Sequence, residues 1–489
     1  MMIRPQVEEA KKYLSNYTVI PVYKEIFADV KTSVEVVKNF MGKNEGSFLL
    51  ESVGNSESWG RYSFIGYNPK LTVRCMDDKI VIGGEKNEEI ITNDPITCLR
   101  NIISQYKSPR FEILPPFTGG FVGYFSYDFY KYSEKSVNLL NSNKDNFDDF
   151  YLMLFDTVVA FDHLKQKIFI VVNTPVENFE NEFKKTEEKI KEIEELIKST
   201  VVKKEQVSKL KSDFKMLYSK KEFKEMVEKI KQHIFEGDIF QAVLSNRAEA
   251  YFEGSLLKTY RILRTTNPSP YMFYLNFGDI EIAGTSPETL VTLKDRELTN
   301  YALAGTCRRG ENDDEDKILI SQLLKDEKEM AEHNMLVDLA RNDLGRVSEF
   351  ASVKVVEHMK VLKFSHVSHM ASVIKSKIKT EYDHLDALSA VLPAGTLSGA
   401  PKKMACEIIN KLEKHKRGTY GGAIGYIDFT GNMDMCIAIR MAKFKNGKVY
   451  VQSGAGIVTD SNPEKEYDEC CQKAQVIINA LNLAQTEEL

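Results

Sequence analysis

Two hydrophobic periods alternate along the chain, one typical of helices and the other of strands. Ser219 and Glu222 make a capping-box pattern, and apolar side chains then recur at helical spacing until Gly237, which predicts a helix between them. Strand-like alternation of polar and apolar residues occurs in three segments, at 70–76, 79–84 and 239–252. The chain is therefore expected to mix strands and helices throughout.

A lysine- and glutamate-rich stretch marks the clearest boundary in the chain. Its first half carries apolar residues near helical spacing, at Phe179, Phe183, Ile190, Ile193 and Ile197. We expect an amphipathic helix there, followed by a polar linker. The chain is accordingly divided into an N-terminal region (1–175), a charged helix and linker (176–213) and a C-terminal region (214–489).

Composition excludes several classes of protein. With 489 residues, 43% of them hydrophobic and 28% charged, the chain is typical of a soluble globular protein with a large core. A net charge of -5 gives no sign of nucleic-acid binding. There is no long apolar run to predict a membrane span and no apolar core of a secretory signal, so a cytoplasmic protein is expected. The seven cysteines form no CxxC pair, which favours reduced thiols.

Two pairs of glutamates stand out in the C-terminal region. Glu329 and Glu332 lie three residues apart, as do Glu466 and Glu469, and this spacing puts both carboxylates of a pair on one face of a helix. Two such helices facing each other would form a cage of four carboxylates. Mg²⁺ is the expected occupant, because it prefers oxygen ligands and leaves coordination positions for an anionic substrate. Taken alone, each pair is more often a solvated helix face.

Ten short strings occur in order along the chain. They are LLES (49–52), NPSPYMFYL (267–275), GTSPETLV (284–291), LAGT (303–306), DEKEMAEHNMLVDLARNDLGRV (326–347), SHVSHMAS (365–372), PAGTLSGAPK (393–402), GTYGGAIGY (418–426), IAIRMA (437–442) and QSGAGIV (452–458). Together they resemble the chorismate-utilising enzymes, and most closely the anthranilate synthase component I family. The resemblance implies an α+β fold in which two facing β-sheets, with helices on their outer faces, hold the substrate between them.

The resemblance also implies catalytic groups. Glu288 is expected to be the general acid beside the leaving hydroxyl, because a carboxyl in a closed pocket can have its pKa raised until it is protonated near neutral pH. His369 is expected near the departing group, and Thr306 in the same region. His366 lacks the family match and is interpreted as structural.

Metal and substrate groups follow from the same resemblance. Glu332 and Glu469 are implied as direct Mg²⁺ ligands, with Glu329 and Glu466 reaching the metal or its waters. Arg440 is expected to grip the enolpyruvyl carboxylate of chorismate with two parallel hydrogen bonds. The other implied substrate-binding residues are Gln241, Ala304, Gly305, Tyr420, Gly454, Ala455, Gly456 and Lys473. Alone, the tyrosine would be a core residue, the glycines simple turns and the lysine a structural ion-pair partner.

Two positions distinguish the reactions of related enzymes. Isochorismate and salicylate synthases carry a water-activating lysine where this chain has Gln241, and many aminodeoxychorismate synthases carry a nucleophilic lysine where it has Ala304. Ammonia needs no strong base to attack, so we expect conversion of chorismate and ammonia to anthranilate and pyruvate through 2-amino-2-deoxyisochorismate. Aminodeoxychorismate synthase component I and a catalytically silent amino-acid sensor stay open as alternatives. The turn at Cys307 departs from the usual family pattern.

A partner and an inhibitor are also expected. None of the seven cysteines has the setting of a glutaminase nucleophile, which implies a hetero-oligomer with a separate glutamine amidotransferase subunit, anthranilate synthase component II. The strings at 49–52 and 267–274 resemble segments of a tryptophan feedback site, although such short strings alone are more often a strand end and a loop. The implied residues are Glu51 for the ammonium group, Ser52 for a hydrogen bond, and Pro270, Tyr271 and Met272 as apolar walls.

Overall fold

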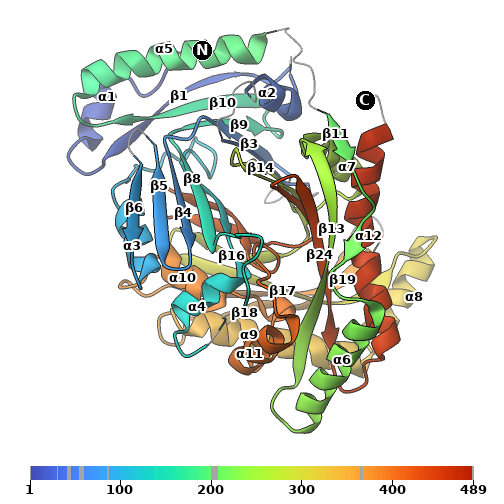
Figure 1. Ribbon diagram of the computed structural model, residues 1–489. Helices are drawn as coiled ribbons and strands as arrows, with labels where there is room; N and C mark the ends of the chain where they lie inside the picture. The colour runs from blue at the N-terminus through green and yellow to red at the C-terminus, as the bar shows by residue number, and fades with distance from the viewer. Residues whose placement is uncertain are drawn as a thin grey trace.

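Two large β-sheets face each other in the computed structural model, and helices cover their outer sides (Figure 1). The structure describes residues 2–29, 31–40, 46–53, 60–84, 87–137, 139, 141–199, 207–363 and 367–486. Within these ranges, all pairings between named strands are antiparallel. The expected α+β arrangement of two facing sheets is therefore confirmed.

The first sheet contains strands from both ends of the chain. Its hydrogen-bonded order is β1 (Val19–Phe27), β10 (Lys167–Pro175), β9 (Thr157–Asp162), β3 (Tyr62–Tyr67), β2 (Ser47–Glu51), β14 (Tyr271–Asn276), β15 (Ile280–Ser286), β23 (Met441–Lys445), β24 (Lys448–Ile457), β13 (Gln241–Gly254) and β11 (Ser208–Leu210). Two short strands, β12 (Lys215–Met216) and β20 (Gly399–Ala400), also pair with β13.

The second sheet is built in the same way. Its order is β18 (Lys354–Lys363), β19 (Val367–Lys377), β17 (Glu297–Arg308), β16 (Thr289–Lys294), β22 (Met433–Ile437), β21 (Ala423–Asp428), β7 (Gly120–Phe125), β8 (Phe150–Phe155), β4 (Leu71–Met76), β5 (Lys79–Gly83) and β6 (Glu88–Ile91). The N-terminal and C-terminal regions meet inside both sheets, where β2 pairs with β14 and β7 pairs with β21. The regions named from the sequence thus share one sandwich.

Helices pack on the outer face of each sheet. Those against the first sheet are α2 (Ser33–Phe40), α5 (Phe179–Lys198), α6 (Lys220–Phe235), α7 (Leu257–Thr266), α11 (Lys402–Glu413) and α12 (Pro463–Thr486). Those against the second sheet include α8 (Asp313–Leu323), α9 (Glu327–Gly345) and α10 (His384–Val391). The remaining short elements are α1 (Val7–Ala10), η1 (Lys11–Tyr13), α3 (Pro95–Ile103), η2 (Tyr127–Phe129), α4 (Tyr130–Ser133) and η3 (Gly395–Leu397).

Local sequence explains the helices that the periodicity predicts. In α6, Oγ of Ser219 accepts from the backbone N–H of Glu222, and the Glu222 carboxylate accepts from the backbone N–H of Ser219, so the capping box is confirmed. Gly237 follows the helix with a φ of +84°, a conformation that glycine adopts without strain. In α5, all five of the apolar residues singled out from the sequence are buried, and the predicted amphipathic helix is confirmed. Residues 200–206 of the predicted linker lie outside the described ranges.

The hydrophobic core is layered like the sheets. The largest cluster fills the space between the two sheets and includes Phe48, Phe121, Phe155 and Phe273. A second cluster joins the outer face of the first sheet to α2, α5, α7 and α12. Within the described residues, no helix is both long and apolar enough to span a membrane. Buried apolar side chains therefore hold the two sheets together and attach the outer helices to the first sheet.

Candidate active site

Two segments of the chain cross between the sheets next to each other. One joins β15 of the first sheet to β16 of the second, and the other returns from β22 to β23. The crossings are tied together because the N–H of Ile437 donates to the carbonyl of Glu288 (3.0 Å) and the N–H of Thr285 donates to the carbonyl of Arg440 (3.1 Å). Glu288 and Arg440, which are far apart in the sequence, are thereby held at one place.

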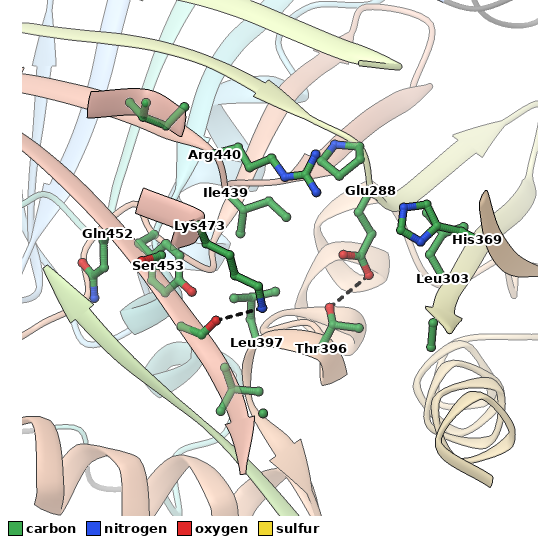
Figure 2. A pocket seen from close by; sticks show the side chains of 17 residues that line it. Glu288, Leu303, His369, Thr396, Leu397, Ile439, Arg440, Gln452, Ser453 and Lys473 are labelled. Carbon is green, nitrogen blue, oxygen red and sulfur yellow. Dashed lines mark hydrogen bonds between the residues drawn. The ribbon is translucent and has the colours of Figure 1, made fainter. Parts of the chain in front are cut away.

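A cavity of about 260 Å³ opens at these crossings (Figure 2). Both sheets, η3 and α12 contribute to its walls. Eight residues expected from the sequence line it: Glu288, Ala304, His369, Tyr420, Arg440, Gly454, Gly456 and Lys473. The site set inferred from the strings is thus largely assembled in one place by the fold.

Glu288 is a buried carboxyl with one hydrogen-bond donor beside it. Oγ1 of Thr396 donates to Oε1 of Glu288 at 3.0 Å, a contact that Figure 2 shows as a dashed line. Burial raises the pKa of Glu288 from 4.5 to about 7, although Thr396 and the Arg440 guanidinium both act to lower it. A substantial fraction of Glu288 is therefore protonated at neutral pH, as a general acid requires.

His369 lies near Glu288 at the same end of the cavity (Figure 2). Burial lowers the pKa of His369, and the positive charge of Arg440 lowers it further, which favours a neutral imidazole. Its strand β19 pairs with β17 around an irregularity at Gly305, whose φ is +80°. The side chain of Thr306 and all of His366 lie outside the part of the chain that the structure describes.

Arg440 is held in an unusual backbone conformation. Its φ is +49°, in the left-handed region that costs an arginine of the order of 1 kcal/mol. Burial lowers the pKa of its guanidinium, while the nearby Glu288 raises it. The two groups thus influence each other's protonation across the cavity, where a bound anion would stabilise the guanidinium.

Close packing explains the glycine at position 454. A Cβ added there would lie 2.7 Å from the carbonyl oxygen of Leu244 and 2.9 Å from the hydroxyl of Tyr420, so a side chain would displace one of them. Nζ of Lys473 donates to the carbonyl of Gly454 at 3.2 Å and forms an ion pair with Glu469 at 2.7 Å. Lys473 therefore joins α12 to the cavity wall.

Three residues expected to bind substrate, Gln241, Gly305 and Ala455, do not line the cavity. Ala455 is buried in the cluster that joins β13 and β24 to α6, α11 and α12, because its side chain points to the opposite face of the strand from its glycine neighbours. Gln241 lies behind Gly456, and its Oε1 is buried with no hydrogen-bond partner among the described residues. Such an oxygen is an acceptor that a small polar ligand could satisfy.

The glutamate pairs lie on α9 and α12, as the spacing predicts. Burial raises the pKa of Glu332, and the neighbouring charges of Glu329 and Glu469 raise it further. Burial also raises the pKa of Glu466, with a contribution from Glu469. Like-charged carboxylates from two helices thus repel one another, and a divalent cation with oxygen preference fits this set chemically. No three of these four described side chains have ligand atoms within 4.8 Å of one another.

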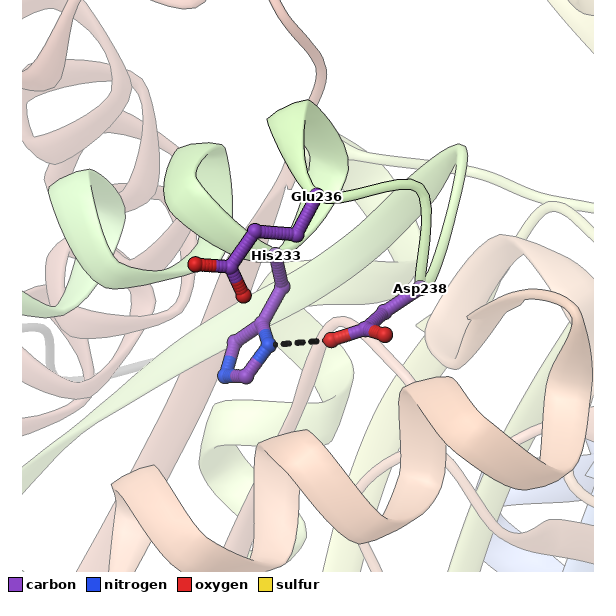
Figure 3. A group of neighbouring side chains, drawn as sticks. All are labelled: His233, Glu236 and Asp238. Atoms are coloured by element: carbon purple, nitrogen blue, oxygen red, sulfur yellow. Dashed lines mark hydrogen bonds and ion pairs between the residues drawn. The ribbon is translucent and has the colours of Figure 1, made fainter.

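A different set of side chains within the described ranges does meet that distance. Ligand atoms of His233, Glu236 and Asp238, at the C-terminal end of α6, lie within 4.8 Å of one another (Figure 3). Nδ1 of His233 is 2.8 Å from the Asp238 carboxylate, and the backbone N–H of Asp238 donates to the carbonyl of His233 (3.0 Å). These contacts close the last turn of the helix, and we assign no metal to them.

A second cavity, of about 110 Å³, lies between β2, β3, β14, β21 and β22. All five residues expected at an inhibitor site border it: Glu51, Ser52, Pro270, Tyr271 and Met272. Arg61, Tyr426 and Asp434 also line it. The fold therefore brings together two short strings that are more than two hundred residues apart.

Glu51 is contacted by several side chains of the protein itself. Glu51 and Met272 face each other on β2 and β14, and both side chains point to the outer face of the sheet. There the Glu51 carboxylate pairs with Arg264 (3.0 Å) and accepts from Tyr260 (2.6 Å) and Ser33 (2.6 Å). These contacts occupy both oxygens of the Glu51 carboxylate, and a ligand's ammonium group, the partner expected from the sequence, would compete with them.

Two polar residues that line these cavities, and one buried behind the first, are absent from the sequence-based assignment. Thr396 holds Glu288, and Asp434 accepts from Tyr271. His333 is fully buried between the carbonyl of Ala304 (3.2 Å) and the hydroxyl of Ser372 (2.7 Å), which joins α9 to the second sheet. The signal for Thr396 was present, because its string was recognised, but its partner is more than one hundred residues away.

The class of protein follows from this arrangement and from comparison with known families. The chorismate binding enzyme family matches residues 47–479, and the chain belongs to this family. Its two facing sheets also resemble those of MenF, the menaquinone-specific isochorismate synthase from Escherichia coli, with a TM-score of 0.70 at 19% identity over 97% of this chain and 98% of that one.

Within the family, the chain is similar over its full length to anthranilate synthase component 1. The protein of that name from Acetivibrio thermocellus is 44% identical over 99% of each chain, and that from Aquifex aeolicus (strain VF5) is 41% identical over 100% of each. The crystal structure of anthranilate synthase component I from Streptococcus pneumoniae TIGR4 is 37% identical and has a TM-score of 0.75, covering 92% of this chain and 98% of that one. The chain thus groups with the component 1 proteins.

Proposed function

We propose that the chain is the large subunit of an anthranilate synthase, which converts chorismate and ammonia to anthranilate, pyruvate and water. The observation that carries this proposal is the buried Glu288, whose pKa is raised to about 7, beside Arg440 and His369 in the 260 Å³ cavity. An acid, a guanidinium and a neutral imidazole are the groups that this conversion of a dicarboxylate needs. The full-length similarity to component 1 proteins supports the same assignment.

In the first step, ammonia adds at C2 of chorismate and the C4 hydroxyl departs. Glu288 donates its proton to that hydroxyl, which leaves as water, and the ring double bonds shift between the two carbons. Arg440 holds the enolpyruvyl carboxylate and so positions the ring with its C4 hydroxyl next to Glu288. The product of the step is 2-amino-2-deoxyisochorismate.

In the second step, the ring becomes aromatic and pyruvate is released. The hydrogen on C2 leaves as a proton, the bond from C3 to the enolpyruvyl oxygen breaks, and the enolpyruvate takes up a proton to become pyruvate. A neutral His369 is able to accept or pass on that proton, and its lowered pKa keeps it neutral. Anthranilate then occupies the cavity.

Mg²⁺ is the cofactor that the glutamates of α9 and α12 would hold. Glu332 and Glu469 are its direct ligands in the proposal, with Glu329 and Glu466 beside them. When bound, the ion neutralises negative charge on a carboxylate of the substrate. Lys473 contacts both Glu469 and the cavity wall, and it thereby orients the Glu469 carboxylate.

Ammonia is supplied from outside this chain in the proposal. All seven cysteines are free thiols, and the three that are only partly buried, Cys98, Cys307 and Cys471, lie outside the cavity lining. A glutamine amidotransferase subunit is therefore proposed as the partner. Gln241 and Ala304 stand where water-activating or nucleophilic lysines occur in related enzymes, which supports ammonia over water as the nucleophile.

Tryptophan is proposed as a feedback inhibitor that binds in the second cavity. Tyr271, Pro270 and Tyr426 supply apolar surface there, and Ser52 lies at the rim, where its hydroxyl accepts from the N–H of Gly60 (3.0 Å). Arg61, which lines the cavity and forms an ion pair with Asp162 (2.9 Å), is the cationic side chain that we propose for the inhibitor's carboxylate. The cavity joins the N-terminal and C-terminal regions, so its occupancy is able to affect the active site.

One experiment tests the proposed reaction. Purified chain is incubated with chorismate, MgCl₂ and ammonium at pH 8, and products are identified by fluorescence and mass. Anthranilate and pyruvate in equal amounts are expected. Aminodeoxychorismate as the end product would favour the alternative synthase, and binding of amino acids without any turnover would favour the sensor. Protein carrying Glu288→Gln is the matched control for turnover at this cavity.

A further inference from the structure

His333 is a buried imidazole on α9 whose two nitrogens both have partners. It has no exposed surface, and its Nδ1 lies 3.2 Å from the carbonyl oxygen of Ala304. Its Nε2 lies 2.7 Å from Oγ of Ser372. Ala304 belongs to β17 and Ser372 to β19, which pair with each other in the second sheet. One ring therefore joins α9 to two neighbouring strands.

The partners of the ring determine which nitrogen carries the proton. A carbonyl oxygen only accepts, so Nδ1 of His333 is the N–H that donates to Ala304. Burial lowers the pKa of His333, which favours a neutral ring, and Nε2 then accepts from the hydroxyl of Ser372. Oγ of Ser372 in turn accepts from the backbone N–H of Met359 (2.9 Å). The hydrogen bonds thus fix a single orientation of the imidazole.

The residue after Ala304 is held from the side of the cavity. The pairing of β17 with β19 is irregular at Gly305, whose φ is +80°. His369, which lines the cavity, makes a hydrogen bond with the backbone of Gly305. In Figure 2, His369 lies beside Leu303, which precedes Ala304 on β17. Two histidines thus hold consecutive residues of one strand, His333 from α9 and His369 from the cavity.

The glutamates of the proposed Mg²⁺ site lie next to His333 on α9. Glu329 is four residues before His333, which places both on one face of the helix, and Glu332 directly precedes His333. A Cβ added to Gly305 would lie 3.4 Å from Oε2 of Glu329, so this carboxylate reaches β17 at the same place. His333 and a glutamate of the proposed metal site therefore share one contact with the Ala304–Gly305 segment.

We propose that His333 is a positioning residue, which fixes the metal-binding helix α9 relative to His369 by holding the backbone of Ala304 and Gly305 between them. The inference rests on the proposed Mg²⁺ site and adds to it a residue that binds neither metal nor substrate. With the bond from Nδ1 to Ala304 in place, the glutamates of α9 and the backbone that holds His369 keep one relative position. Mg²⁺ then binds without having to order the helix, which favours its affinity.

Loss of the bond to Ala304 would change two measurable quantities. Mg²⁺ would have to order α9 itself and would therefore bind more weakly. His369 would lose part of its support, so kcat would fall, whereas the KM for chorismate would stay the same because Arg440 is untouched. One hydrogen bond between uncharged groups corresponds to about two- to tenfold in an equilibrium constant.

Two substitutions separate the hydrogen bonds of the ring. His333→Asn places an amide N–H near the position of Nδ1 and keeps the donor to Ala304, whereas His333→Gln places its amide near Nε2 and keeps only the partner of Ser372. Calorimetry with MgCl₂ in the absence of chorismate measures the Kd of each full-length protein. We expect Kd to rise by about tenfold in His333→Gln and by less than about threefold in His333→Asn. kcat should fall in the same order, at an unchanged KM for chorismate.

The Kd for Mg²⁺ also distinguishes positioning from a loss of folded protein. A misfolded fraction lowers the number of sites in the isotherm and leaves Kd unchanged. Ser372→Ala is a second test that keeps His333 itself, and it should raise Kd by about two- to tenfold. Its matched control is Ser376→Ala on the same face of β19, where the buried Oγ accepts from Ser348 (2.7 Å) instead of contacting a histidine. This control should keep the Kd of the unmodified protein.

The outcomes separate the inference from the reaction proposed above. Equal Kd values for His333→Asn and His333→Gln overturn the role of the bond to Ala304. If neither variant folds, equal Kd values for Ser372→Ala and Ser376→Ala overturn it in the same way. An unmodified protein that forms anthranilate but binds no Mg²⁺ overturns the metal site and this inference together. An unmodified protein that forms no anthranilate overturns the proposed reaction, and the Mg²⁺ isotherms still decide the role of His333.

Discussion

Replacement of Glu288 by glutamine should have opposite effects on activity and on stability. Glutamine keeps the size of the side chain and the acceptor for Thr396, but it cannot donate the proton of a carboxylic acid. Loss of a general acid lowers the rate by about 10²–10⁴-fold. We therefore expect kcat/KM for chorismate to fall by at least about two orders of magnitude in Glu288→Gln, with the protein still folded.

The stability change follows from the raised pKa. A carboxyl whose pKa is 4.5 when unfolded and about 7 when folded favours the protonated form in the folded state. Its contribution to stability is fully present below pH 4.5 and is lost as the pH rises through 7, at a total cost of about 3 kcal/mol. Glutamine, which does not ionise, avoids this cost. The variant should thus gain about 2–3 kcal/mol over the unmodified protein between pH 5 and pH 8.

Thermal unfolding and pH profiles check both effects. For 489 residues, the unfolding entropy is about 1 kcal/mol per kelvin, so the difference in Tm between variant and unmodified protein should change by about 2–3 °C between pH 5 and pH 8. The kcat/KM of the unmodified protein should decline above pH ~7 as Glu288 loses its proton. In Thr396→Val this decline should move to higher pH, because the Thr396 hydrogen bond lowers the Glu288 pKa. A Tm difference that is the same at both pH values, together with no decline near pH 7, would refute the reasoning.

Three further predictions concern the metal, the nucleophile and the inhibitor. Glu332→Gln or Glu469→Gln should leave a folded protein that has little turnover at limiting Mg²⁺ and binds Mg²⁺ more weakly by calorimetry. The control Glu327→Gln, on the exposed start of α9, should keep both turnover and Mg²⁺ binding, and unchanged turnover in either of the first two variants contradicts their assignment. Because glutamine stands at position 241, the unmodified chain should form no isochorismate, whereas Gln241→Lys is expected to form some, as judged by mass and chromatography. Isochorismate from the unmodified protein would contradict the assignment of ammonia as the nucleophile. L-tryptophan should inhibit at subsaturating chorismate, and Ser52→Phe should relieve the inhibition because the new ring fills the rim of the second cavity; equal inhibition of both proteins by millimolar tryptophan would remove Ser52 from the site.

Features set by neighbours in the sequence were predictable from it. The capping box at Ser219, the stop at Gly237 and the stripe of α5 depend on residues within one or two helical turns, so the pattern alone identifies them. The spacing of Glu329 and Glu332 likewise places both on α9. The order of the strings, in turn, was sufficient for the family and hence for the two facing sheets.

Contacts between distant residues were decided by the tertiary structure alone. Glu51 is an acid at the end of a strand in sequence, but only the packing of α2 and α7 on that face neutralises it with Arg264. The meeting of Glu288 with Arg440 depends on two crossings between sheets lying next to each other. Periodicity and capping are short-range effects of the backbone, whereas burial and ion pairing depend on which surfaces the fold brings together. Burial in the assembled cavity is what raises the pKa of Glu288 to about 7.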